Sequence, residues 1–286
     1  MSESPPARAL VVDLDNTLYN FDDAFARSIR GLVHAISRET GFAEDAIEAD
    51  IRRVLVAHGS LEYPNLIDEL ETLCAPDTST DEQERLRRIA VGAFRRVRSH
   101  NLALFPGVRD TLKWAKDSGL SLIALSDAPA FQAEGRLRHF KLDGYFDALF
   151  SWEGIAASPR LKAAARTYTP RIAKRVTLSE HARKPNPDGL RQALRHVGVE
   201  PCDSYVVGDS LTRDVAVANA AGASSVWAYY GTQIDSANRE TINRIFPSDT
   251  AAPTQIRSAA AAEEPWRTIH AFGELREIIG GQTSLF

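Results

Sequence analysis

The sequence predicts an α/β protein: a Rossmann-like parallel sheet with helices on both faces, and an inserted all-α domain, a four-helix bundle. Two observations lead to this prediction. Beyond residue 105, short apolar runs alternate with helical segments, which is typical of βαβ units. Between the first apolar run, residues 9–12, and that region, the periodicity is purely helical. We therefore expect a core of residues 1–18 and 102–286, and an inserted helical domain of residues 19–101, called the cap below.

Composition narrows the possible functions. The chain has 286 residues, 44% hydrophobic and 25% charged, with a net charge of −4. This charge predicts neither nucleic acid nor a membrane surface as a partner. Cys74 and Cys202 lack metal-ligand spacing. The first residues lack the features of a signal peptide, so we expect a cytoplasmic location. The sequence does not predict an oligomeric state.

The first predicted strand, residues 9–12, ends at two acids one residue apart, Asp13 and Asp15. In an extended segment both side chains project to the same side, because strand side chains alternate. Two adjacent carboxylates repel each other unless a cation lies between them or one holds a proton. The alternative is a strand end and a turn, where Asp and Asn are common.

The cap contains four amphipathic stretches joined by short loops, which predicts a four-helix bundle. Thr80 with Gln83 has the pattern of a capping box and predicts the start of the fourth helix. Polar residues near the middle turn have two readings, contact with a substrate or ordinary exposure to solvent. They are Arg52, Arg53, His58, Tyr63 and Asn65. The apolar positions at helical spacing are Ile29, Leu32, Val33 and Ile36; Ile47, Ile51, Val54 and Leu55; Leu66, Leu70 and Leu73; and Leu86, Ile89, Ala90 and Phe94.

The α/β part continues with predicted strands at residues 120–125, 146–150, 205–207 and 225–229, and an edge strand within 266–272. Helices are expected to begin near 107, 131, 187, 214 and 275. Two stretches fit less well. Residues 152–182 are strongly basic, and are either a flap that attracts an anion or a solvated helix or loop. Residues 248–265, rich in alanine, predict a linker.

Polar residues also follow the later strands. Ser126 ends the second strand, and Asp209 ends the fourth, with Asp214 five residues on. Lys184 precedes a helix. Each residue alone also fits a turn, a helix start or a solvated loop. In an open α/β sheet, however, the carboxyl ends of the strands are where ligands bind. Together they predict a single site there.

These residues carry a resemblance to a known family. Asp13-Leu14-Asp15-Asn16-Thr17-Leu18, Ser126, Lys184-Pro185 and Gly208-Asp209-Ser210 with Asp214 resemble, in order, the four motifs of the haloacid dehalogenase superfamily of phosphohydrolases. The helical insert is similar to the family's cap between motifs one and two. The motifs span residues 13–214 of the chain.

The resemblance implies a role for each residue. Asp13 would be the nucleophile and Asp15 the general acid and base. Mg²⁺ would be held by Asp13, Asp209 and the backbone carbonyl of Asp15, all hard oxygen ligands. Asp214 would orient metal-bound water or Lys184 without touching the metal. The phosphate-binding group would be Asn16, Thr17, Ser126, Asp127 and Lys184.

The predicted reaction is hydrolysis of a small organic phosphate monoester through an aspartyl-phosphate, with a phosphorylated metabolite such as a nucleotide or sugar phosphate as substrate. The dehalogenase branch resembles this sequence but lacks an acid at the position of Asp15, because a halide needs no proton. Asp15 therefore favours a phosphate ester. Two alternatives remain open: a phosphomutase of the same family, and a catalytically silent binding protein on the same fold.

Overall fold

A single parallel sheet forms the centre of the structure, a computed structural model that describes residues 8–74, 78–154, 171–247 and 263–280. Its strand order in these residues is β4-β3-β2-β1-β5-β6-β7. The middle strand β1 pairs with β2 and β5, so that Val11 lies opposite Ile123 and Val206. The strands are β1 (Ala9–Val12), β2 (Ser121–Pro129), β3 (Ala148–Trp152), β4 (Lys174–Leu178), β5 (Ser204–Gly208), β6 (Ser224–Ala228) and β7 (Arg267–Ile269).

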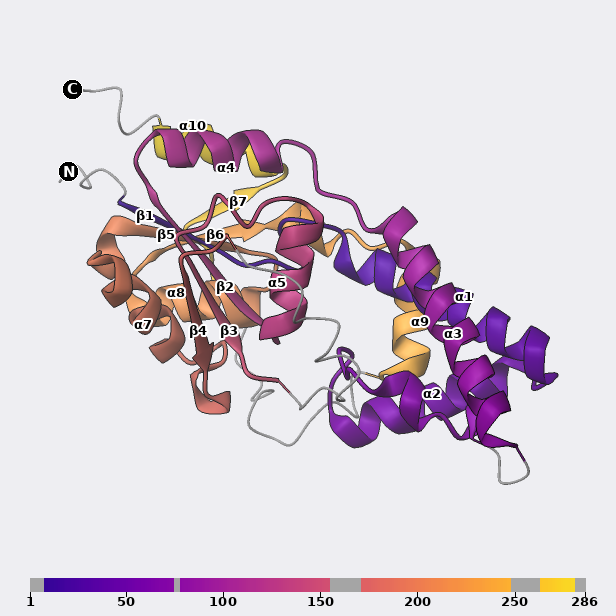
Figure 1. Cartoon of the computed structure of the whole chain (residues 1–286). Helices are drawn as coiled ribbons and strands as arrows, with labels where there is room; N and C mark the ends of the chain where they lie inside the picture. The colour runs from indigo at the N-terminus through magenta and orange to yellow at the C-terminus, as the bar shows by residue number, and fades with distance from the viewer. Residues whose placement is uncertain (1–7, 75–77, 155–170, 248–262, 281–286) are drawn as a thin grey trace.

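Helices cover both faces of this sheet (Figure 1). One hydrophobic cluster joins Leu10 and Val12 of β1 to α4 (Val108–Asp117), α5 (Ala130–His139) and α10 (Leu275–Gly280). A second cluster joins Val11 to α7 (Asp188–Val197) and α8 (Ala216–Ala221). Alternate residues of one strand thus supply both cores, as a sheet buried on two faces requires. The predicted fold class is confirmed.

Short helical turns complete the sheet domain. A π-helical turn, η5 (Leu211–Val215), precedes α8, so the helix that we expected near residue 214 begins with an irregular turn. The 3-10 turns are η3 (Glu180–Ala182), η4 (Pro201–Asp203), η6 (Tyr229–Thr232) and η7 (Phe272–Glu274).

The cap contains three long helices, α1 (Phe21–Thr40), α2 (Glu44–His58) and α3 (Thr80–Asn101). The predicted third helix is wrong: it is two 3-10 turns, η1 (Leu66–Glu69) and η2 (Glu71–Leu73), separated by an extended Leu70. The reason is that Asp50 accepts hydrogen bonds from the backbone N–H and hydroxyl of Thr72, at 2.8 and 3.0 Å, replacing helical bonds. At α3, Ser79 caps the first turn, rather than Thr80.

A helix from the far end of the chain packs against the cap. α9 (Ser236–Ile245) follows the sheet yet contacts α1 and α2, and lies beside them in Figure 1. Arg30 of α1 donates to Asn238 at 2.6 Å and to Thr241 at 2.8 Å, while Asp23 accepts from Asn238 at 2.5 Å. Sequence patterns did not indicate this partner. The division of the chain into residues 19–101 and the rest stays a prediction.

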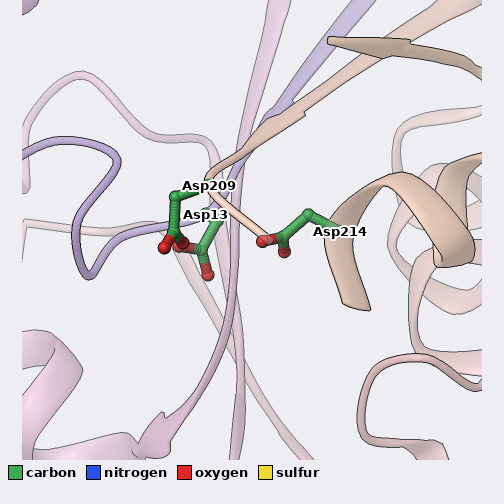
Figure 2. A group of neighbouring side chains, drawn as sticks. All are labelled: Asp13, Asp209 and Asp214. Atoms are coloured by element: carbon green, nitrogen blue, oxygen red, sulfur yellow. The ribbon is translucent and has the colours of Figure 1, made fainter. Parts of the chain in front are cut away.

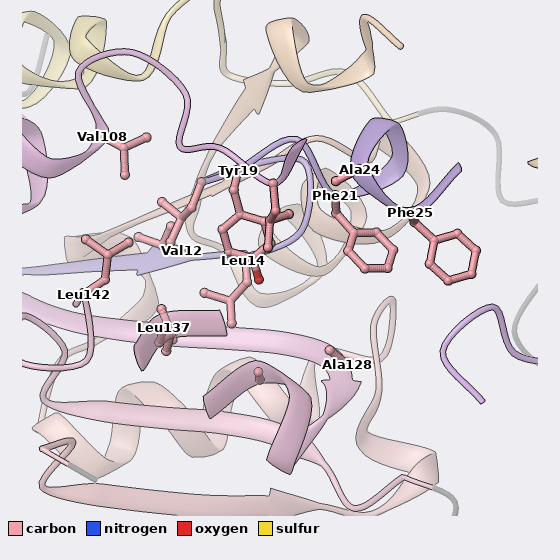
Figure 3. Close-up of a cluster of buried hydrophobic side chains, with 14 of the residues drawn as sticks. Val12, Leu14, Tyr19, Phe21, Ala24, Phe25, Val108, Ala128, Leu137 and Leu142 are labelled. Atoms are coloured by element: carbon pink, nitrogen blue, oxygen red, sulfur yellow. The ribbon is translucent and has the colours of Figure 1, made fainter. Parts of the chain in front are cut away.

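The hydrophobic core is continuous from the sheet to the cap. Figure 3 shows Val12 at the end of β1 and Leu14 just after it, then Tyr19 and Phe21, leading to Phe25 of α1. The two connections run side by side, since Asn20 and Ala103 share a backbone hydrogen bond of 3.2 Å. The acids that follow β1 therefore lie close to the start of the cap.

The basic stretch at residues 152–182 contains an edge strand where we expected a loop, helix or flap. In β4, Val176 lies opposite Phe150 of β3, and Lys174 and Arg175 are exposed. Charged side chains are typical of edge strands, where they discourage pairing of the open backbone edge with another chain. Residues 155–170, like 248–262 of the predicted linker, lie outside the described residues. The predicted edge strand within 266–272 is confirmed as β7.

Candidate active site

Asp13 begins the site, directly after β1. Its backbone N–H donates to Val207 of β5 at 2.9 Å, which fixes it between the two strand ends. Its side chain is 9% exposed and accepts two hydrogen bonds, from Lys184 Nζ at 2.5 Å and from Thr17 Oγ1 at 3.1 Å. The sequence predicted this placement because parallel strands end at one edge of the sheet.

Two further carboxylates converge on Asp13 (Figure 2). Asp209 follows β5 and Asp214 lies in η5; one oxygen from each of the three lies within 4.8 Å of the others. Gly208 permits this approach, because a Cβ there would lie 2.2 Å from Cγ of Asp214. Asp214 also accepts from the Ser210 N–H at 3.1 Å. A glycine is therefore required before Asp209.

Lys184 supplies the cation of this cluster. Its ammonium donates to Asp13 and Asp214, both at 2.5 Å, and to the Leu125 carbonyl at 3.3 Å. Burial disfavours the charged ammonium, but the two carboxylates outweigh burial and raise the pKa of Lys184 above its ordinary value. The lysine therefore stays protonated at neutral pH.

The carboxylates themselves are held in an unfavourable environment. Burial raises the pKa of Asp13 to about 7; Lys184 opposes this shift and Asp214 adds to it. Burial, with Asp214 and Asp13, raises the pKa of Asp209 well above its ordinary value. Three carboxylates less one ammonium leave a charge of −2 when all are ionised. A divalent cation with hard oxygen ligands balances this charge, so the residues fit Mg²⁺.

Asp15 is paired with Arg136, whereas Asp13 is paired with Lys184. Both of its oxygens accept from Nη1 of Arg136, at 2.7 and 2.6 Å. Arg136, 2% exposed, also donates to Glu62 of the loop between α2 and η1 and to Gln132 at 2.8 Å. Burial opposes the guanidinium charge, but Asp15 and Glu62 outweigh it and raise the pKa of Arg136. Neither Arg136 nor Glu62 was predicted from the sequence.

The five predicted phosphate-binding residues lie around the same edge of the sheet. Ser126 is buried and its Oγ accepts from the Ala128 N–H at 3.1 Å. Asp127 accepts from the Lys184 N–H at 3.1 Å and pairs with Arg213 at 3.0 Å. Its carboxylate therefore positions the loop of Lys184.

Asn16 and Thr17 also use their side chains within the protein. Asn16 has a φ of 57° and accepts from the Asp22 N–H at 3.0 Å, at the start of α1. Thr17, fully buried, donates to Asp13 and accepts at its carbonyl from Tyr230 at 2.7 Å. The left-handed turn at Asn16 directs the chain from the strand into the cap.

Part of this site lines a cavity of about 440 Å³, whereas Lys184 and Asp214 are not among its lining residues. Asp13, Asp15, Asp209 and Ser126 form one wall, with Arg183 and Arg213 beside them. The opposite wall comes from the cap loop at residues 59–62 and from Ile242, Asn243 and Phe246 at the end of α9.

The five candidate cap residues behave differently from one another. Arg53 pairs with Asp50 at 2.7 Å, and His58 contacts Glu69 at 2.8 Å. Tyr63 lines a neighbouring cavity, whereas Arg52 is exposed and Asn65 lines neither cavity. The choice between contact with a substrate and ordinary exposure to solvent stays open for these residues.

The fold and the site define an α/β enzyme whose carboxylate cluster lies at the carboxyl ends of central parallel strands. The sequence model of the haloacid dehalogenase-like hydrolase family matches residues 7–222, and the chain belongs to this family. Membership confirms the resemblance predicted from the motifs and the class of enzyme, a phosphohydrolase of this superfamily.

Individual relatives are distant. A glyceraldehyde 3-phosphate phosphatase from Methanopyrus kandleri is 25% identical over 77% of this chain and 82% of its own. A phosphoglycolate phosphatase from Pseudomonas fluorescens is 25% identical over 78% of this chain and 70% of its own. Among solved structures, a 2-haloacid dehalogenase from Pseudomonas syringae pv. tomato has a TM-score of 0.58 at 20% identity, over 96% of this chain and 99% of that one. The structural likeness concerns the fold. No described helix is long and apolar enough to cross a membrane.

Proposed function

We propose that this chain is a Mg²⁺-dependent phosphatase that hydrolyses a small organic phosphate monoester through an aspartyl-phosphate on Asp13. One observation carries the proposal: Asp13 lies within 4.8 Å of Asp209 and Asp214 and bonds Lys184, with a second acid, Asp15, in the same cavity. A nucleophile, a cation site and a proton donor are the parts that phosphoryl transfer needs.

In the first step, an oxygen of Asp13 attacks phosphorus and the ester P–O bond breaks. A protonated Asp15 gives its proton to the leaving oxygen, which departs as an alcohol. For this transfer one Asp15 oxygen must turn from Arg136 toward the substrate. Lys184 keeps Asp13 oriented and places positive charge beside the phosphoryl oxygens.

In the second step, Asp15 takes a proton from water, which attacks the phosphorus of the aspartyl-phosphate. The bond between Asp13 and phosphorus breaks, and inorganic phosphate leaves. Mg²⁺, held by Asp13, Asp209 and the carbonyl of Asp15, would neutralise phosphoryl charge in both steps. Ser126 would hold a phosphoryl oxygen, together with nearby backbone N–H groups.

The relatives support the choice of phosphate chemistry. Two of them are named for phosphatase activity on small phosphorylated metabolites, glyceraldehyde 3-phosphate and phosphoglycolate. Asp15 supports it independently, because an acid two residues after the nucleophile is needed for an alkoxide leaving group and not for a halide. A small phosphorylated metabolite is therefore the proposed substrate, and the cytoplasmic location stays a prediction.

The test is phosphate release from p-nitrophenyl phosphate and a panel of metabolite phosphate esters, with Mg²⁺ and with EDTA. We expect turnover with Mg²⁺, and its loss in EDTA and in Asp13→Asn. Asp117→Asn is the matched control, because Asp117 is exposed on α4 and pairs with Lys113. No release from any ester would contradict the proposal and favour the catalytically silent binding protein.

The phosphomutase alternative shares the same acids. A sugar monophosphate is the substrate that separates the two activities. A phosphatase releases inorganic phosphate, whereas a mutase returns an isomeric sugar phosphate. Product analysis by ³¹P NMR distinguishes the outcomes.

A further inference from the structure

A second cavity, of about 400 Å³, adjoins the proposed active site. Phe21, Leu61 and Glu62 line both cavities, so the two meet at these residues. The second cavity lies between α1, α3, α5 and the loop after α2, and Arg136, which holds Asp15, forms part of its wall. This cavity is called the side pocket below.

The direction of the leaving group points to the side pocket. The leaving oxygen must contact Asp15, which lines the same cavity as Phe21, Leu61 and Glu62. Groups attached to that oxygen therefore extend from Asp15 toward Phe21, Leu61 and Glu62, where the side pocket begins.

The walls of the side pocket are apolar and aromatic. Phe21 and Phe25 stack with ring centroids 5.7 Å apart, and Phe94 meets Phe25 edge-on at 6.1 Å. Leu61, Leu66 and Ile67 also belong to the apolar part of the lining. Such a surface favours a flat hydrocarbon group over a hydrated one.

The charges of the side pocket do not balance. Its lining contains four arginines and two acids. Glu62 is bound by Arg136, and Asp68 by Arg87, which leaves Arg95 and Arg98. Within the described parts of the chain, neither side chain has a hydrogen-bond or ion-pair partner, and Arg98 is half-buried. Burial and the neighbouring Arg136 cation lower the pKa of Arg98 and outweigh the opposing effect of Glu62, so an anion there would relieve an unfavourable charge.

We propose that the side pocket binds the alcohol part of the substrate, and that this part is an apolar or aromatic group ending in an anion that pairs with Arg98. The inference rests on the proposed phosphatase function and names its substrate class: a phosphate monoester with a second negative group across a hydrocarbon body. An anion binds a guanidinium through charge-assisted hydrogen bonds, which a neutral group of equal shape lacks.

The experiment compares kcat/KM for 3- and 4-carboxyphenyl phosphate with the neutral 3- and 4-carbamoylphenyl phosphates of the same shape. For whichever carboxyphenyl phosphate is the better substrate, we expect kcat/KM to be at least ten times that of the matching carbamoylphenyl phosphate. Arg98→Gln should bring this ratio of kcat/KM values near one, mainly by raising KM for the carboxylate. Arg98→Lys should retain part of the preference. Arg96→Gln is the control, since Arg96 is exposed on the same helix and outside the lining. Thermal unfolding of each variant shows that it is folded.

A binding measurement separates the two proposals. Calorimetry with 3- and 4-hydroxybenzoate against the corresponding hydroxybenzamides needs no turnover, and the benzoate preference should depend on Arg98. Turnover of all four esters without preference, unaffected by Arg98→Gln, would overturn the side-pocket proposal and leave the phosphatase intact. Absence of turnover with Arg98-dependent benzoate binding would overturn the phosphatase and retain the anion site. Equal binding of benzoates and benzamides would overturn the anion site.

Discussion

Replacing Arg136 by methionine tests whether the buried network around Asp15 stabilises the protein. Arg136 is 2% exposed, and the side chains of its partners Asp15 and Glu62 are 20% and 15% exposed. The substitution retains much of the side-chain length and removes the charge, which leaves Asp15 and Glu62 close together without the cation that bonds them. Removing one partner of a buried ion pair costs roughly 3–5 kcal/mol. Because both acids retain some solvent, we expect about 3 kcal/mol, a fall in Tm of about 6–12 °C.

The assay is urea and thermal unfolding at pH 7.5 in EDTA, with Glu62→Gln and the double variant included. Glu62→Gln removes one of the two negative charges that Arg136→Met leaves without their bonded cation. The double variant should therefore lose less free energy of unfolding than the two single variants lose together, by about 1 kcal/mol or more. Arg175→Met is the control. Arg175 of β4 makes an exposed ion pair, at 3.1 Å, with Glu134, which lies on α5 as Arg136 does. A loss below about 1 kcal/mol in Arg136→Met, with additive double-variant effects, would refute the reasoning.

Three other predictions follow from the contacts around the site. Burial raises the pKa of Asp13 to about 7 from 3.8, so the folded protein holds the Asp13 proton more tightly than the unfolded chain does. In EDTA, the free energy of unfolding that this proton adds is fully present below pH 3.8 and is lost as the pH rises to about 7. Mg²⁺ must displace this proton, and its Kd measured by calorimetry should weaken up to about tenfold per pH unit below 7; a constant Kd from pH 5.5 to 8 is the contrary result. Gly208→Ala should destabilise the protein by about 1–3 kcal/mol in urea unfolding, because the new Cβ meets Asp214 at 2.2 Å, whereas Gly92→Ala has nothing within 4 Å and should not destabilise. Arg30→Met should speed hydrogen exchange in α9, since it removes bonds of 2.6 and 2.8 Å to that helix; unchanged exchange there would show that these bonds do not hold α9.

The residues that converge on Asp13 were predictable because topology alone brings them together. In a parallel sheet with β1 between β2 and β5, the carboxyl-terminal parts of these strands share one edge. Ser126, in the second half of β2, and Asp209, directly after β5, therefore lie near Asp13. Lys184 is not at a strand end, and it was predicted from its motif. The structure adds that Lys184 reaches Asp214 as well as Asp13.

Arg136 was not predictable from a motif, but its position contained a signal. On α5 the buried residues Ala133, Arg136 and Leu137 share one helix face, so a cation lies where an apolar residue is expected. A buried arginine requires an acid, and Glu62 lies in an irregular loop whose position no periodicity fixes. The same limitation applies to α9, whose partner helices α1 and α2 precede it by about two hundred residues.

The two acids that follow β1 depend on cations from different parts of the chain. Asp13 is bonded by Lys184, whose other partners, Asp214 and the Leu125 carbonyl, also belong to the sheet domain. Asp15 is bonded by Arg136, which at the same time holds Glu62 in the loop between α2 and η1. A displacement of that loop would therefore change the charge around Asp15, the proposed proton donor, while the bonds of Lys184 to Asp13 remain. The structure thus links the position of the loop to proton transfer and leaves the orientation of the nucleophile independent of it.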